Sequence, residues 1–127
     1  MTTPQLILYG FLVLIILIYV RRFFLTRSVL RYTPAQLDDR MREGGLVLLD
    51  VRTAGEFSGG HIKGAVHIPV QELVRRSGEL KKHADREIVC YCQSGSRSLM
   101  AAARLKQLGF RASHLEGGIA EWNFSHR

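Results

Sequence analysis

The apolar residues divide the chain into two parts with different patterns. Residues 6–20 form an unbroken apolar run, whereas short apolar runs separated by polar segments recur from residue 46 onward. These later runs, at 46–51, 65–69 and 87–91, are typical of strands, and residues 112–115 (ASHL) are expected to form a last strand. The first of them has no polar alternation, which indicates a strand covered on both faces, as in a parallel sheet.

The segments between these runs have helical patterns. They comprise residues 35–42, 53–58, 70–82 (one or two short helices), 99–108 and a closing helix around Trp122. In the 99–108 segment, apolar residues recur at helical spacing and are expected to face the core: Ala101, Ala102, Leu105 and Leu108. Alternating strands and helices predict an α/β fold, a parallel sheet with helices on both faces.

The N-terminal apolar run has the composition of a membrane-spanning helix. A helix over residues 4–20 is about 25 Å long, and the arginines and aromatic residues that follow make up the difference to the ~30 Å hydrocarbon core. A cleaved signal peptide fits less well, because no Lys or Arg precedes Arg21 and bulky residues stand where cleavage would occur. A buried core helix also fits less well, since so small a domain cannot bury a helix that is apolar on all sides.

These patterns divide the chain into a transmembrane anchor (1–25), a juxtamembrane linker (26–31) and a folded domain (32–127). The arginines nearest the apolar run all lie on its C-terminal side, at positions 21, 22, 27 and 31. The positive-inside rule therefore predicts that the folded domain lies in the cytoplasm, with a bacterial inner membrane as the expected location. The short linker holds the domain near the bilayer, where its arginines can contact anionic lipid.

Charge and cysteine content narrow the function classes. The net charge is +7, but residues 28–127 carry only 15 basic and 11 acidic side chains, and no basic run is interleaved with aromatic residues. Nucleic-acid binding is therefore not expected. The two cysteines, Cys90 and Cys92, are one residue apart, which excludes a disulfide framework, and no partner residues at ligand spacing indicate a metal site. This cysteine usage fits a reducing compartment and a reactive thiol.

The most informative stretch is residues 92–98, which joins a predicted strand to a predicted helix. It places Cys92 at the end of the strand, followed by small residues and then by the helix N-terminus. Unpaired backbone N–H groups and the positive end of a helix dipole stabilise an anion at such a position. We therefore expect Cys92 to be a nucleophilic thiol with a lowered pKa in an accessible loop.

Three motifs in this order resemble the rhodanese-like domain. Residues 50–57 (DVRTAGEF) and 60–69 (GHIKGAVHIP) resemble its N-terminal signature, residues 91–98 (YCQSGSRS) its active-site loop, and residues 116–118 (EGG) with Trp122 its C-terminal signature. The resemblance covers about residues 30–125. It implies a five-stranded parallel sheet flanked by helices, here preceded by one transmembrane helix, and a single-domain sulfurtransferase that uses no cofactor.

The resemblance also implies roles for individual residues. Cys92 would take a sulfane sulfur from a donor such as thiosulfate, hold it as a persulfide, and pass it to cyanide, a small thiol or a protein thiol. The loop residues would bind the sulfur anion and the donor: Gln93, Ser94, Gly95, Ser96 and Arg97. Backbone N–H groups of this loop are expected to stabilise thiolate and persulfide, and Arg97 to bind the sulfonate end of the donor.

Other polar residues are expected to have structural roles. By resemblance, Asp50 and Arg52 hold loops together through a buried ion pair, and Glu56 and His61 are structural as well. Ser98 lies near the helix start and is a candidate cap. Cys90 shares a strand face with Cys92, so a resolving role stays open beside that of an inert core cysteine.

Two other functions remain as alternatives. The first is a rhodanese-like module that binds a partner at the membrane without catalysis, although the intact Cys92 and Arg97 disfavour it. The second is a phosphatase or arsenate reductase. The span from Cys92 to Arg97 is six residues, the length associated in this family with sulfur transfer, whereas the phosphate-binding relatives have one residue more.

Overall fold

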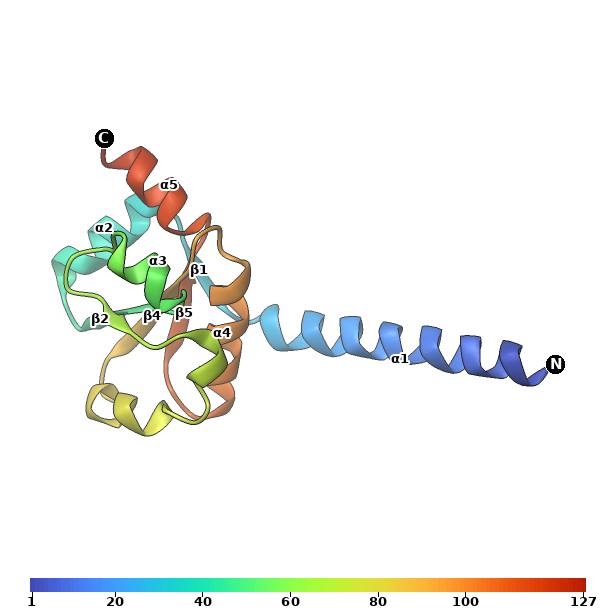
Figure 1. Ribbon diagram of the computed structural model, residues 1–127. Coiled ribbons are helices and arrows are strands. Elements are labelled where there is room, and N and C mark those ends of the chain that lie inside the picture. The colour runs from blue at the N-terminus through green and yellow to red at the C-terminus, as the bar shows by residue number, and fades with distance from the viewer.

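The computed structural model describes residues 1–127, which form a long N-terminal helix and an α/β domain (Figure 1). The helices are α1 (Thr3–Thr26), α2 (Pro34–Glu43), α3 (Ala54–Ser58), α4 (Ser96–Gln107) and α5 (Gly118–Ser125), with two 3-10 helices, η1 (Val70–Glu72) and η2 (Ser77–His83). The strands are β1 (Leu30–Tyr32), β2 (Leu46–Asp50), β3 (Val66–His67), β4 (Glu87–Tyr91) and β5 (Ala112–Leu115).

The five strands form one parallel sheet in the order β1-β5-β4-β2-β3. The central strand is β4, and it pairs with β2 so that Asp50 lies opposite Tyr91. The carboxyl ends of these two strands therefore meet at one edge of the sheet, so the chain segments that follow them lie side by side. The five-stranded parallel fold expected from the sequence is confirmed.

The edge strand β1 was not predicted from the apolar pattern of the sequence. β1 is three residues long and begins at Leu30, within the range assigned to the juxtamembrane linker. It pairs with β5, and Tyr32 O accepts a hydrogen bond from Glu116 N at 2.8 Å. Two of its three side chains are exposed. A short edge strand with this exposure leaves no apolar signal in the sequence.

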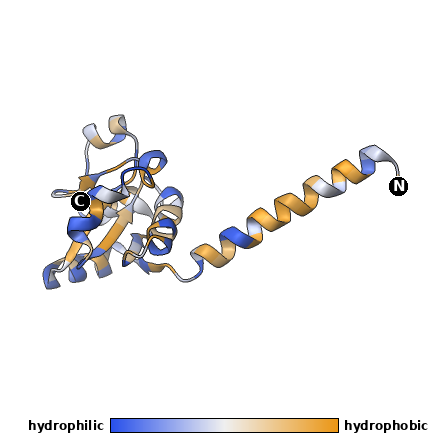
Figure 2. Cartoon of the chain, turned by 90° about the horizontal axis from the view of Figure 1, so that it is seen from below, coloured by the Kyte–Doolittle hydropathy of each residue, from blue (hydrophilic) through white to orange (hydrophobic).

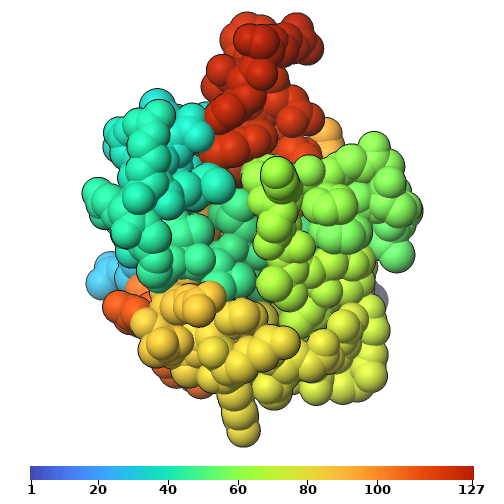
Figure 3. Space-filling model, turned by 90° about the vertical axis from the view of Figure 1, so that its left-hand side faces the viewer, coloured from blue at the N-terminus to red at the C-terminus, as the bar shows by residue number.

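Two apolar clusters cover the two faces of the sheet. One contains Ile88 and Cys90 of β4 with Leu80 of η2 and the buried alanines of α4. The other contains Val89 and Tyr91 of β4 with Leu37 of α2 and Trp122 of α5. Alternate residues of β4 thus enter opposite layers. Figure 3 views the face opposite α1, where α2 (cyan), the α3 segment (green), η2 (yellow) and the C-terminal helix (red) are seen together.

The helix that follows β4 differs from the predicted one at both ends. α4 begins at Ser96 rather than at residue 99, because Gly95 adopts φ +112°, a left-handed conformation that turns the chain directly into the helix. At the other end, Leu108 was expected to face the core but is 44% exposed. It is the C-cap residue, where the chain leaves helical geometry, and Gly109 follows with φ +96°.

The N-terminal helix α1 projects from the domain with its apolar side chains uncovered. Thr26, in its last turn, is its one buried residue, Leu25 is half-buried against the core of the domain, and the other residues of the helix are exposed. Figure 2 shows it as apolar along most of its length, with one polar turn close to the domain. At 24 residues it is long and apolar enough to cross a membrane, and its length of about 36 Å exceeds the ~30 Å hydrocarbon core.

Candidate active site

The sulfur of Cys92 lies inside the loop that connects β4 to α4. The backbone N–H groups of Gly95 and Ser98 donate to Sγ at 3.0 and 3.4 Å, and Ser98 Oγ lies 3.6 Å from Sγ. Contrary to the expectation of an accessible thiol, the Cys92 side chain is fully buried. The loop is tight enough that its own backbone surrounds the sulfur.

This surrounding determines the acidity of Cys92. Burial by itself would raise the pKa of the thiol. The hydrogen bonds that the Ser98 hydroxyl and the N–H groups of Ser98, Gly95 and Ser94 make with Sγ outweigh burial, and the pKa of Cys92 is lowered overall. These groups form an environment that stabilises a thiolate; the Ser98 hydroxyl contributes most, and the three backbone N–H groups add to it.

The same sulfur caps helix α4. The N-cap residue Gly95 has no side chain, so it cannot accept the hydrogen bonds that a Ser, Thr, Asp or Asn would accept at this position. Ser98 is the third residue of α4, and its N–H donates to Sγ. Cys92 Sγ thus receives an N–H bond that a capping side chain usually takes. Ser98 itself is inside the helix, not at its cap.

Ser98 connects the thiol to a histidine that sequence reasoning missed. Its Oγ lies 3.1 Å from His114 Nδ1 and 3.1 Å from Gly95 O, in addition to its contact with Sγ. His114 belongs to β5 and is buried, its Nε2 has no hydrogen-bond partner, and burial lowers its pKa. A neutral imidazole that donates from Nδ1 to Ser98 leaves the single hydroxyl proton for one of two acceptors, Gly95 O or the thiolate.

The start of α5 orients the loop carbonyls. Ile119 N donates to Cys92 O at 2.9 Å, and Ala120 N donates to Gln93 O at 3.2 Å. With two carbonyl oxygens held by α5, the N–H groups further along the loop point to the sulfur. Gly118 permits this contact: a Cβ on it would lie 2.5 Å from both carbonyl oxygens, and its φ is +64°.

Asp50 and Arg52 form a buried ion pair beside the loop. Arg52 Nη2 lies 2.8 Å from Asp50 Oδ2, and Arg52 Nε lies 3.1 Å from each carboxylate oxygen. The same guanidinium donates to Gly60 O at 2.7 Å and to Gln93 Oε1 at 3.4 Å. Arg52 therefore connects the end of β2 to the turn after α3 and to the Cys92 loop, and none of these contacts reaches the sulfur.

Arg97 is occupied by Glu56 of α3. Its Nη1 and Nη2 donate to the two Glu56 oxygens at 2.7 and 3.0 Å, and both side chains are about one-third exposed. This pairing, together with the capping contact from Thr53, lowers the pKa of Glu56 to about 2. The pKa of Arg97 is raised, chiefly by Glu56 and also by the nearby Cys92.

The remaining candidate residues lie outside the sulfur's hydrogen-bond shell. The side chains of Gln93, Ser94 and Ser96 are exposed, and neither serine hydroxyl bonds Sγ. Cys90 is fully buried in the core, which raises the pKa of its thiol. The exposed His61 bonds Phe57 O through Nδ1. No group of three or more His, Cys, Asp or Glu side chains is placed to hold a metal ion.

A polar cavity of about 420 Å³ adjoins the loop. Its lining comes from the α3 segment, the loop and α5, and includes Arg52, Glu56, His61, Gln93 and Asn123. One lining residue in nine is apolar. A cavity of this polarity suits a small charged molecule better than an apolar one.

The sequence model of the rhodanese-like domain family matches residues 33–125. The chain belongs to this family. A sulfurtransferase of Allochromatium vinosum is 41% identical over 78 residues, which are 61% of this chain and 71% of that protein. An HTH-type transcriptional regulator of Mycobacterium tuberculosis is 40% identical over 96 residues, which are 73% of this chain but only 41% of the regulator.

Solved rhodanese-like structures agree with this assignment. The crystal structure of a rhodanese-related protein from Thermoplasma volcanium superposes with a TM-score of 0.69 at 30% identity, over 76% of this chain and 92% of that one. The rhodanese-like domain thus occurs both as most of a relative's chain and as a minor part of one. The sulfurtransferase among the relatives supports a sulfurtransferase family.

Proposed function

We propose that this protein is a membrane-anchored sulfurtransferase that carries sulfane sulfur as a persulfide on Cys92. The observation that supports it best is that the backbone N–H groups of Gly95 and Ser98 donate to Cys92 Sγ, in a six-residue loop of a rhodanese-like domain. Such donors stabilise one negative charge on sulfur, whether on a thiolate or on the outer atom of a persulfide.

The reaction proceeds in two displacements. The Cys92 thiolate attacks the outer sulfur of thiosulfate, a new S–S bond forms, and the S–S bond of the donor breaks as sulfite leaves with its electron pair. Cyanide or a thiolate then attacks the outer sulfur of the persulfide. Thiocyanate or a new persulfide forms, and Cys92 leaves as the thiolate that begins the next cycle. Neither displacement needs a metal ion or a cofactor.

The buried thiol makes access part of the mechanism. In the closed loop, Arg97 is paired with Glu56, and Gln93 faces the polar cavity between α3 and α5. We assign this cavity to the donor and acceptor. A donor anion that competes with Glu56 for the Arg97 guanidinium separates the ion pair and is held close to Cys92, since guanidinium binds sulfonate and carboxylate oxygens alike and Arg97 lies near Cys92.

The anchoring part of the proposal rests on α1. Its apolar side chains are uncovered, and its length suits a bilayer. Arg21, Arg22 and Arg27 follow the apolar run on the domain side, which supports a cytoplasmic domain by the positive-inside rule. We place the domain at the cytoplasmic face of a bacterial inner membrane.

The test is mass spectrometry of the full chain after incubation with thiosulfate and removal of excess donor. We expect a gain of one sulfur atom on the peptide that contains Cys92, and its loss when cyanide is added. A Cys92→Ser variant should gain nothing, whereas Cys90→Ser, the matched control from the same strand face, should still be loaded. A Cys92→Ser protein that still turned over thiosulfate would exclude the mechanism.

The full burial of Cys92 favours one second candidate, a partner-binding module without catalysis. That candidate predicts no persulfide with any donor and a specific complex that survives Cys92→Ser. A loaded wild-type protein excludes it.

A further inference from the structure

A second cavity, larger than the one beside the Cys92 loop, has no lining residue from that loop. It has a volume of about 660 Å³ and lies where the domain end of α1 meets the η1 segment (residues 70–74) and α4; we call it the α1–α4 groove. Its floor includes Leu73 and Ala101, which are buried, and its walls include Ile18 and Val74, which are exposed.

The polar part of the groove is cationic. Arg21 and Arg22 from α1 and Arg104 from α4 line it, and no acidic residue does. The nearest acidic side chain in sequence, Glu72, is paired with Arg75 at 2.6 Å and with Arg76 at 3.7 Å. Three guanidinium groups therefore share an apolar groove without a carboxylate among its lining residues.

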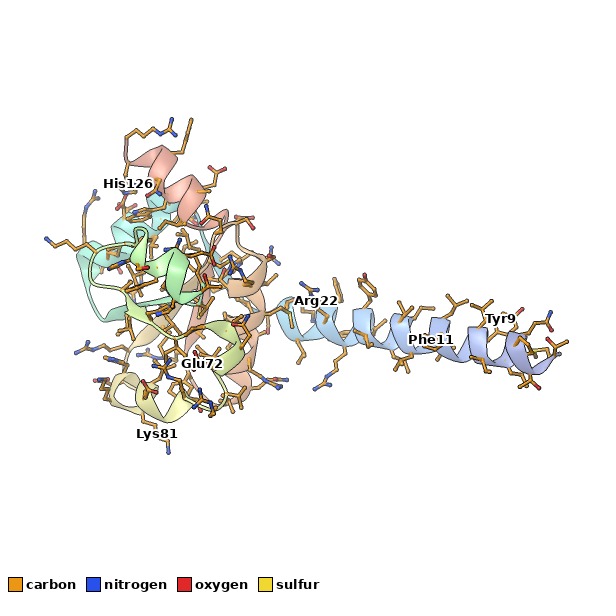
Figure 4. The ribbon with its side chains drawn as sticks, viewed as in Figure 1. Tyr9, Phe11, Arg22, Glu72, Lys81 and His126 are labelled. Atoms are coloured by element: carbon orange, nitrogen blue, oxygen red, sulfur yellow. The ribbon has the colours of Figure 1, made fainter.

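The groove lies at the point where the apolar surface of α1 begins. Ile18 belongs both to the groove lining and to the uncovered apolar run. Figure 4 shows Arg22 at the domain end of α1, and Tyr9 and Phe11 far out on the same helix. If α1 spans a bilayer with this end at the cytoplasmic face, the groove lies at headgroup depth, with its apolar wall continuous with the hydrocarbon.

We propose that the α1–α4 groove binds the headgroup of an anionic phospholipid. The lipid phosphate contacts Arg22 and Arg104, since guanidinium forms paired hydrogen bonds with phosphate oxygens, and the acyl chains follow the apolar side of α1 past Ile18. The proposal rests on the membrane anchoring in the proposed function. It adds a lipid class, and it gives the domain a fixed contact with the bilayer surface.

The experiment uses the full chain in vesicles of phosphatidylcholine with one-fifth phosphatidylglycerol, a small part of which carries a photoactivatable acyl group near the headgroup. After irradiation, labelled peptides are mapped by mass spectrometry. We expect labelling in residues 70–74 and 100–107, and less of it when the photolipid is a phosphatidylcholine. Arg104→Gln should lower it about fivefold, the factor that corresponds to the ~1 kcal/mol of one arginine near an anionic surface.

Two control variants come from outside the groove, and a third variant tests the groove wall. Arg42→Gln removes an exposed arginine of α2, on the other side of the sheet, and should leave labelling unchanged. Val74→Glu places an acid on the exposed wall of the groove and should lower labelling as Arg104→Gln does, whereas Leu108→Glu, an exposed leucine that does not line the groove, should not. Circular dichroism verifies that each variant is folded.

The outcomes separate the two proposals. Alkaline extraction of the vesicles reports whether α1 is inserted. Insertion with equal labelling by both photolipids, or with labelling that Arg104→Gln does not change, overturns the lipid site and leaves the anchor. Labelling abolished by inorganic phosphate identifies a free-anion site and also overturns it. Extraction of the wild-type protein from the vesicles refutes the anchor, and the lipid site with it.

Discussion

The chain passes from a strand to a helix at two neighbouring junctions, after β2 and after β4, where the carboxyl ends of these strands lie side by side. The two junctions differ in how the N–H groups at the start of the helix find a hydrogen-bond partner. After β2, the chain enters α3 with Thr53 as a side-chain cap that accepts from Glu56 N. After β4, it enters α4 at Gly95, with no side-chain cap, and Ser98 N donates to Cys92 Sγ. The β2 junction satisfies its own donors with side chains, whereas the β4 junction leaves its donors for a sulfur anion.

The charges at the two junctions differ in the same way. Asp50 at the β2 junction is neutralised by the buried Arg52. Cys92 at the β4 junction is stabilised by dipoles and hydrogen bonds, with Arg97 committed mainly to Glu56. In the mechanism that we propose, the negative charge moves from the thiolate to the outer sulfur of a persulfide. Backbone N–H groups can stabilise both anions, because they are dipoles and do not neutralise the charge. The β2 junction thus has a structural role, whereas the β4 junction forms the candidate active site.

The largest expected effect comes from removing the buried ion pair at the β2 junction. Asp50→Ala leaves the Arg52 guanidinium buried without its partner, and we expect a loss of about 3 kcal/mol or more in the free energy of unfolding. Urea unfolding measures it. The matched control is Asp39→Ala, which removes an exposed partner of Arg42 and should cost under about 0.5 kcal/mol. Equal losses in the two variants would show that the buried pair does not stabilise the fold.

A smaller effect should follow from pushing α5 away from the β4 junction. Gly118→Ala places a Cβ against the carbonyls of Cys92 and Gln93 at a positive φ, and we expect a loss of about 2 kcal/mol in stability. Iodoacetamide should also modify Cys92 more slowly at neutral pH, because the N–H groups lose their orientation. Gly109→Ala, at φ +96° with open space around it, isolates the backbone strain and should leave the Cys92 rate unchanged.

Removing the Ser98 hydroxyl should lower the reactivity of Cys92. Ser98→Ala deletes a hydrogen bond to the thiolate, so the pKa of Cys92 rises towards that of an ordinary thiol. Below that pKa, alkylation depends on the thiolate fraction, and the rate at neutral pH should fall roughly threefold to tenfold. The rate at high pH should be unchanged. Ser94→Ala, which removes an exposed hydroxyl from the same loop, should keep the wild-type pH profile.

The smallest effect concerns the contact that joins the two junctions. Glu56→Gln weakens the pair with Arg97, which is partly exposed, so we expect a loss of about 1 kcal/mol near neutral pH. The folded pKa of Glu56 is about 2, below the ordinary 4.5. The stability that it contributes is therefore complete above about pH 4.5 and disappears as the pH falls to about 2. A difference between wild type and variant that stayed constant across this range would contradict the ion pair.

Sequence patterns predicted the parts of this fold that have strong local signals. The buried strands β2 and β4 have continuous apolar runs, and the position of Cys92 between a strand and a helix is visible in the order of residue types. β1 was missed because three residues at a sheet edge carry no pattern. His114 was missed because its neighbour Ser98 is brought to it only by the pairing of β5 with β4.

The burial of Cys92 was also beyond local reasoning. A Gly/Ser loop is ordinarily exposed, and the expectation of an accessible thiol followed from that. The loop closes because α5, which is far along the chain, holds the carbonyls of Cys92 and Gln93. One sequence feature is related to this contact, the glycine pair at 117–118. From sequence alone, that pair is equally consistent with a simple turn.

Only three residues, 27–29, separate α1 from β1, and an extended chain of that length reaches about 10 Å. If α1 spans a bilayer, as we propose, a domain on so short a linker has almost no freedom to move away from the membrane surface. Under that proposal, Cys92 stays at a nearly constant distance from the bilayer, and lateral diffusion sets how often it meets a membrane-bound acceptor. Soluble acceptors would have to come to that surface, so the three-residue linker would limit which thiols can receive sulfur from Cys92.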